Sequence, residues 1–257
     1  MQGVVLRTDT DMIREEDRDY FASRQSKADA IMADIQSLVH SDVQSRRISV
    51  LEVGANSCFI AQRLRSKAEW DMHCLEIDSD RLLRYPDICR SFKSVLADAT
   101  AIPFANGAFD LVICNHTLEH IVRYEDCINE MLRVTREGGY LYLAFPNSDR
   151  LVDEIGISWT KTKGNLSWYF ARLFRASTIE SRVRFHIGLA YGQIKTACRG
   201  HKVVCLSKGH AVRSLGRTAG AIAGRVPAAV FDRFSPVGVY FVEKAALNEG
   251  METKAQI

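Results

Sequence analysis

The chain has 257 residues, 47% of them hydrophobic and 25% charged, which supports a folded core and excludes wholesale disorder. Its net charge is only +3, but residues 1–150 carry an excess of six acidic residues and residues 151–235 an excess of ten basic ones. The basic half is either a solvated face or a surface for an acidic partner. No apolar run approaches the roughly 20 residues of a membrane span or the core of a signal peptide, so we expect a cytoplasmic protein.

The N-terminal segment divides into two parts. Residues 1–22 are polar without a clear period, which indicates a loosely attached arm. Apolar residues then recur at steps of three and four from Ser26 to His40, which predicts an amphipathic helix that packs on the edge of the following domain. We assign residues 1–47 to this arm and helix.

Strand and helix patterns alternate from residue 48 to residue 145. Short apolar runs predict strands over 48–53, 72–77, 93–97, 108–114 and 140–145, and helical spacing marks 59–65, 81–84 and 125–134. Gly138-Gly139 is expected to end the last of these helices. This order predicts a mostly parallel sheet covered on both faces, with ligands beyond the carboxyl ends of its strands.

Two more strands are expected near the C-terminus. Residues 201–207 and 239–243 have strand character, and the roughly 30 residues between them predict a helical insertion.

Seven cysteines are spread along the chain, and no two of them are spaced as C-x-x-C. Several lie in apolar runs, as Cys74 does in MHCLEI and Cys114 in LVICN. We therefore expect buried, reduced thiols and no metal site.

Chemistry-bearing residues follow each of the first four predicted strands, and the loop after the fourth reads Asn115-His116-Thr117-Leu118-Glu119-His120. The turn Gly54-Ala55-Asn56 follows the first strand, and its N–H groups together with the next helix N-terminus favour a carboxylate. About 20 residues later a carboxylate is placed to accept hydrogen bonds from a ribose diol; Asp78 is our first choice and Glu76 the alternate. Asp98 ends the third strand, where it can receive the exocyclic amine of adenine.

The succession LEVGAN, LEID, ADATAIPFANGAFDLVICNHTLEHI and LRVTREGGYLYLAFPN resembles the class I S-adenosylmethionine-dependent methyltransferases. The resemblance covers residues 48–147 and is closest to the type 11-like branch, which modifies small molecules, lipids and sugars. It implies a doubly wound, Rossmann-like α/β fold whose mostly parallel seven-stranded sheet has an antiparallel last strand. It also implies S-adenosyl-L-methionine as the cofactor.

The resemblance also implies roles for individual positions. The expected cofactor-binding residues are Glu52 and Gly54 for the methionine part, Asp78 for the ribose, Asp98 and Ala99 for the adenine, and Asn115 for the methionine amine. Asn56 stands where the family usually has another glycine, and asparagine tolerates the positive φ required there. Cys58 is a second departure, which could crowd the cofactor.

The remaining residues are expected to select the acceptor. Residues 148–245 are assigned to a substrate and lid region with the last two strands, and 246–257 to a tail. Aromatic and basic residues over 148–200 suit a lid over an apolar, anionic acceptor, a peripheral membrane contact, or simple packing on the sheet. We expect a small-molecule, lipid or saccharide acceptor methylated at oxygen, with His116 or His186 as general base.

Two other functions fit parts of the sequence. The basic second half suits an RNA methyltransferase, although no RNA-binding module or N-P-P-Y-type motif accompanies it, so nucleic acid is not the expected partner. The glycine-poor turn suits a non-catalytic module that keeps the fold and acts through protein contacts.

Overall fold

The computed structural model describes residues 13–38, 47–146, 189, 191–214, 225, 227 and 237–246. Within these residues seven strands form one sheet in the order β3-β2-β1-β4-β5-β7-β6. The first five are parallel: β1 (Ser49–Val53), β2 (Asp71–Glu76), β3 (Lys93–Leu96), β4 (Phe109–Asn115) and β5 (Thr135–Pro146). β7 (Val237–Glu243) is antiparallel to both β5 and β6 (Lys202–Cys205). The predicted fold class is confirmed, including the antiparallel last strand.

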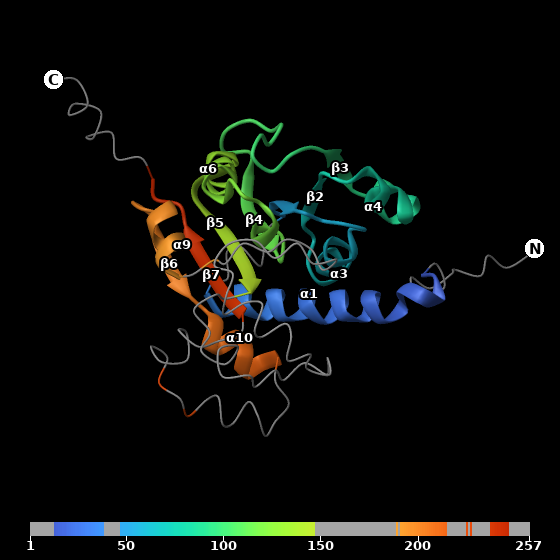
Figure 1. Cartoon of the computed structure of the whole chain (residues 1–257), viewed down its shortest axis with the longest axis horizontal. Helices are drawn as coiled ribbons and strands as arrows, with labels where there is room; N and C mark the ends of the chain where they lie inside the picture. The colour runs from blue at the N-terminus through green and yellow to red at the C-terminus, as the bar shows by residue number, and fades with distance from the viewer. Residues whose placement is uncertain are drawn as a thin grey trace, which may run out of the picture.

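Helices cover both faces of the sheet (Figure 1). α1 (Arg18–Leu38) and α3 (Phe59–Lys67) bury apolar residues on one face, and α6 (Tyr124–Val134) and α9 (Tyr191–Ala197) on the other. The short helices α4 (Ser79–Arg84) and α5 (Pro86–Arg90) connect β2 to β3, and α10 (Ser207–Ser214) begins the connection from β6 to β7. The expected helical insertion therefore starts as a helix, and most of the rest of it lies outside the described residues.

The N-terminal helix is longer than its apolar period predicts. α1 begins at Arg18 rather than near Ser26, and a 3-10 turn, η2 (Glu15–Asp17), precedes it. Aromatic packing extends the helix, because the rings of Tyr20 and Phe21 lie 6.0 and 5.0 Å from the ring of Phe59 on α3. Residues 13–22 are thus part of an ordered element rather than a loose arm, and residues 1–12 lie outside the described part.

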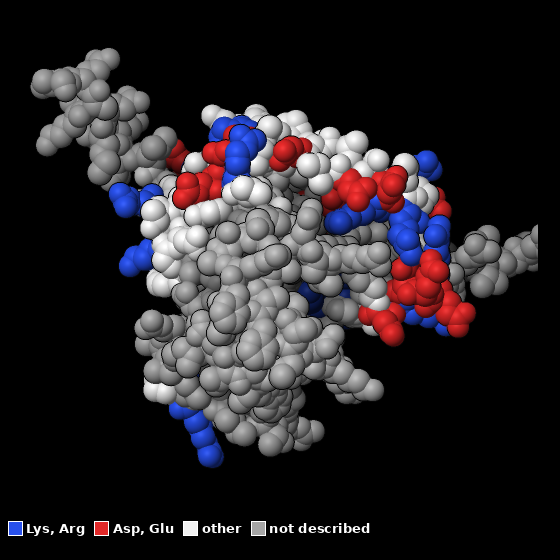
Figure 2. Space-filling view, viewed as in Figure 1, with Lys and Arg blue, Asp and Glu red and all other residues white. Residues whose placement is uncertain are grey.

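Charged side chains attach this end of α1 to α4. Arg84 Nε lies 2.8 Å from Asp17 Oδ2, and Arg84 Nη2 lies 3.0 Å from Glu16 Oε1. Figure 2 shows acidic side chains gathered at the start of α1 beside basic side chains of α4. These ion pairs hold the N-terminal end of α1 against α4, close to the α1 residues that line the site described below.

The glycine pair after α6 does not end that helix as expected. α6 ends at Val134, and Gly138 and Gly139 lie inside β5. Between Thr135 and Tyr140 the pairing with β4 shifts register, and Gly138 adopts φ +63° there. The glycines therefore form a bulge in a strand.

Several predictions concern residues outside the described part, among them most of the lid over 148–200, His186 and nearly all of the tail. None of the helices that the structure describes is both long and apolar enough to cross a bilayer. Six of the seven cysteines are buried, Cys205 is half-buried, and all seven are free thiols.

Candidate cofactor site

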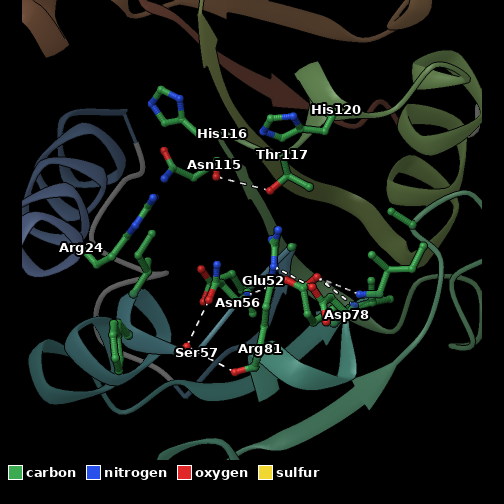
Figure 3. A pocket seen from close by; sticks show the side chains of 18 of the residues that line it. Arg24, Glu52, Asn56, Ser57, Asp78, Arg81, Asn115, His116, Thr117 and His120 are labelled. Atoms are coloured by element: carbon green, nitrogen blue, oxygen red, sulfur yellow. Dashed lines mark hydrogen bonds and ion pairs between the residues drawn. The ribbon is translucent and has the colours of Figure 1, made fainter. Parts of the chain in front are cut away.

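A pocket of about 440 Å³ lies at the carboxyl ends of β1, β2, β3 and β4 (Figure 3). The loops after these four strands and one side of α1 line it. Its volume is in the range of small-molecule sites. All seven residues predicted to bind the cofactor line this pocket: Glu52, Gly54, Asn56, Asp78, Asp98, Ala99 and Asn115.

Three residues of the turn after β1 have positive φ, a backbone conformation that residues other than glycine rarely adopt. Gly54 has φ +74°, and a Cβ atom there would lie only 2.2 Å from Thr117 Oγ1. Asn56 and Cys58 also have positive φ, at 52° and 57°. Cys58 is fully buried in the core and does not line the pocket, so it leaves the cofactor room.

The amides of this turn are already used within the protein. The backbone N–H groups of residues 54, 55, 56 and 58 donate to oxygens of Leu75, Glu76 and Ala55 at 2.7–3.0 Å. The N–H of Ala61 at the start of α3 donates to Glu52 Oε2 at 3.0 Å. The turn therefore offers a carboxylate fewer free donors than we expected from the sequence.

Two acidic side chains lie at the end of β2, Glu76 and Asp78, and they make different contacts. Glu76 is 2% exposed, and its carboxylate accepts the N–H groups of Ile77, Asp78 and Asn56 at 2.7–3.2 Å. Asp78 caps α4 by accepting the N–H of Asp80 at 3.0 Å, and it lies 3.1 Å from the Arg81 guanidinium. Both residues line the pocket, but only Glu76 is held there by three amides.

Asp98 is fixed by the residue two positions later. Its Oδ1 accepts both the N–H and the hydroxyl of Thr100, each at 2.8 Å. These hydrogen bonds, the backbone one first, hold the pKa of Asp98 below its usual value. Asp98 is thus an ionised acceptor at neutral pH on the side of the pocket where β3 ends.

The other end of the pocket gathers buried polar groups around β1 and α1. Burial raises the pKa of Glu52 to about 8, although the Ala61 N–H opposes this. Within the described residues, Asn115 Nδ2 and Arg24 Nε are buried and have no hydrogen-bond acceptor. In Figure 3 the Arg24 side chain extends from α1 toward the same side of the pocket as Asn115.

His116 is held in a strained conformation beside this end. Its φ is 52°, its N–H donates to Ala144 O at 2.7 Å, and its Nδ1 lies 3.4 Å from Oε1 of Glu119, which is 2% exposed. Burial lowers the pKa of His116, so its ring is neutral at neutral pH and can accept a proton.

The pocket residues that sequence reasoning missed include Tyr20, Arg24 and Thr117. Tyr20 and Arg24 lie on α1, about 30 residues before the first motif, and no local pattern marks them. Thr117 occupies the place that a Cβ atom on Gly54 would take. A glycine in a turn can mark such a close neighbour, but the sequence does not say which residue it is.

The residues present fit S-adenosylmethionine. Carboxylates stand at the ends of β2 and β3, where a ribose diol and an adenine amine need acceptors. Gly54 lets the Thr117 side chain pack directly against the turn after β1, because a Cβ atom at residue 54 would clash with it. The buried donors on Arg24 and Asn115 have no partner within the described chain, as expected where a ligand supplies the acceptor.

Comparison with known proteins agrees with this geometry. Residues 51–143 match the family model of a methyltransferase domain. The chain is 33% identical over 92 residues to a demethylmenaquinone methyltransferase of Mycolicibacterium vanbaalenii, an alignment that covers 36% of this chain and 39% of that protein.

Solved structures show the same fold. A methyltransferase of Thermotoga maritima aligns with a TM-score of 0.53 at 12% identity, covering 89% of this chain and 94% of the other. A phosphoethanolamine N-methyltransferase of Haemonchus contortus, in complex with S-adenosyl-L-methionine, aligns with a TM-score of 0.50 at 12% identity, covering 90% and 59%.

The curated relative is matched over little more than a third of its length, and the matched segment is the part of the chain that builds the pocket. The strand order, the family match and the donor set identify the same kind of domain. The chain therefore carries a methyltransferase domain of the class I S-adenosylmethionine-dependent family.

Proposed function

We propose that the protein transfers a methyl group from S-adenosylmethionine to an oxygen of a small apolar or lipid-like acceptor. One observation carries the proposal: acidic side chains at the ends of β2 and β3 line one pocket with the glycine turn after β1 and the Asn115-His116 segment after β4. That arrangement provides a separate partner for each part of the cofactor.

Glu76 is the better candidate for the ribose, and Asp98 for the adenine amine. The side chain of Asp78, our first choice from the sequence, is 44% exposed and pairs with Arg81, whereas three amides fix the buried Glu76 carboxylate in the pocket wall and leave it one lone-pair site for a ligand. Glu52 and Asn115 remain the candidates for the amino-acid end. When bound, the cofactor supplies an electrophilic methyl on a sulfonium, so the protein's main task is alignment of the reacting groups.

The pocket rim supports an apolar acceptor. Ile77 and Ile121 line the pocket, and Ile77 and the neighbouring Val122 are 66% and 70% exposed. The similarity to a demethylmenaquinone methyltransferase favours the same acceptor class, although it covers only the cofactor-binding part of the chain.

His116 is the candidate general base. An acceptor hydroxyl must lose its proton as its oxygen attacks, and the neutral ring of His116 lines the pocket after β4. Glu119, 3.4 Å from Nδ1, would orient the ring and stabilise the imidazolium that forms. His186 stays an alternative from the sequence, outside the described residues.

The test is to incubate the protein with methyl-labelled S-adenosylmethionine and a cell extract, and then to separate lipid, glycan, RNA and protein fractions. We expect label in the lipid fraction, and its loss with the His116→Gln variant. Label confined to RNA would refute the acceptor class, and cofactor binding without transfer into any fraction would refute the enzymatic assignment.

A further inference from the structure

Arg24 places a positive charge in the pocket, and none of the described residues forms an ion pair with it. It lies one turn after Tyr20 on α1, and its guanidinium carbon sits 4.5 Å from the centroid of the Tyr20 ring. Both side chains line the pocket, and Arg24 Nε is buried without an acceptor in the described residues. The Tyr20 ring therefore orients a guanidinium whose buried N–H still needs an acceptor.

The acidic groups nearby do not neutralise this charge. Arg24 acts electrostatically on Glu52, but burial raises the pKa of Glu52 to about 8, so that carboxyl is protonated at neutral pH. Glu119 lies against the neutral ring of His116 and is one carboxylate against two cations, Arg24 and Lys27. Lys27, one turn further along α1, has its pKa lowered to about 8 by burial and then by Arg24. This side of the pocket thus has an excess of positive charge.

An anion at this end finds most of the amides of the turn after β1 already used, so side-chain donors gain importance. The amides of residues 54, 55, 56 and 58, and that of Ala61 at the start of α3, already donate within the protein. Two buried donors remain beside the turn, Arg24 Nε and Asn115 Nδ2. Charge-assisted hydrogen bonds from a guanidinium match the planar geometry of a carboxylate.

We propose that Arg24 binds the α-carboxylate of the cofactor's methionine part and so makes α1 a specificity-determining element of the site. The inference rests on the proposed function, because it takes S-adenosylmethionine to be the ligand of this pocket. It adds a residue outside the matched segment 51–143 and gives the N-terminal helix a role in ligand selection.

The test compares two ligands that differ only in this carboxylate: S-adenosylmethionine and its decarboxylated form. Calorimetry on the full chain should show that the wild type prefers the intact cofactor by roughly 10- to 100-fold, as expected for hydrogen bonds to a charged group. Arg24→Gln should lose that preference by weakening the intact cofactor alone. Arg24→Lys should recover part of it, because the charge stays and the planar fork is lost.

Arg18→Gln is the matched control, because Arg18 is exposed on the same helix outside the pocket and its loss should leave both affinities unchanged. The ratio of the two affinities within one variant does not depend on the fraction of folded protein. Equal affinities in the wild type, or an equal loss of both ligands in Arg24→Gln, would overturn this inference and leave the proposed function standing. A wild type that binds neither ligand would overturn both.

Discussion

Gly54→Ala tests the geometry of the turn most sharply. Two costs are expected from the structure. A side chain at φ +74° costs about 1–2 kcal/mol in the left-handed region. The new Cβ would also lie 2.2, 2.4 and 2.8 Å from the Oγ1, Cγ2 and Cβ atoms of Thr117, an overlap that costs a further 1–3 kcal/mol or so.

Gly107→Ala separates these two costs. Gly107 has φ +68°, but a Cβ there would approach no atom closer than Arg136 Cα at 3.5 Å. We expect this control to lose only the conformational part, about 1 kcal/mol after the smaller entropy of the unfolded alanine chain is subtracted. The Gly54 variant should lose about 2–4 kcal/mol.

The measurement is the free energy of unfolding from urea titration followed by circular dichroism. Thr117→Ala removes two of the three overlapping atoms, so combining it with Gly54→Ala should recover part of the loss, giving a favourable coupling energy. Equal destabilisation by the Gly54 and Gly107 variants, or no coupling with Thr117, would show that Gly54 and Thr117 are not in contact.

Three further predictions concern charged groups. Protonated Glu52 contributes stability that is fully present below its ordinary pKa of 4.5 and is lost as pH rises through about 8. The free energy of unfolding from urea titration should therefore fall between pH 5 and pH 8 by a few kcal/mol more in the wild type than in Glu52→Gln. An equal fall in both proteins would contradict a buried, protonated carboxyl. The pKa of His116 is lowered, so kcat/KM should stay level from pH 7 to pH 8 and fall only below pH 6.5. His116→Gln should lose about 100-fold in kcat/KM, and an unchanged pH profile in that variant would exclude His116 as the base. Glu76→Gln should weaken cofactor binding in equilibrium dialysis at least tenfold, whereas Asp78→Asn should weaken it only a few-fold; the reverse order would return the ribose to Asp78.

The alternation of strands and helices was predictable because each central strand is a short apolar run and each crossover helix has its own period. The glycine pair at 138–139 shows where local rules fail. Such a pair ends a helix in many sequences, but here Val134 is followed at once by strand pairing of Thr135 with Phe109, and the glycines form the bulge that restores the register.

The site was predictable where it follows the strands and unpredictable where it depends on tertiary packing. All seven predicted cofactor residues line the pocket because parallel strands end at one edge of a sheet. Choosing between Glu76 and Asp78 required the structure, although an aspartate directly before a helix is a common N-cap and could have weakened the choice of Asp78. Arg24 was not predictable, because its place in the pocket depends on where α1 crosses the sheet edge.

The most direct measurement for the account as a whole is calorimetric titration of the wild-type chain with S-adenosylhomocysteine at neutral pH. The convergence of Glu76, Asp98, Gly54 and Asn115 on one pocket predicts saturable binding of one ligand per chain. Absence of binding by a chain that circular dichroism shows to be folded would contradict the assignment of this pocket to the cofactor.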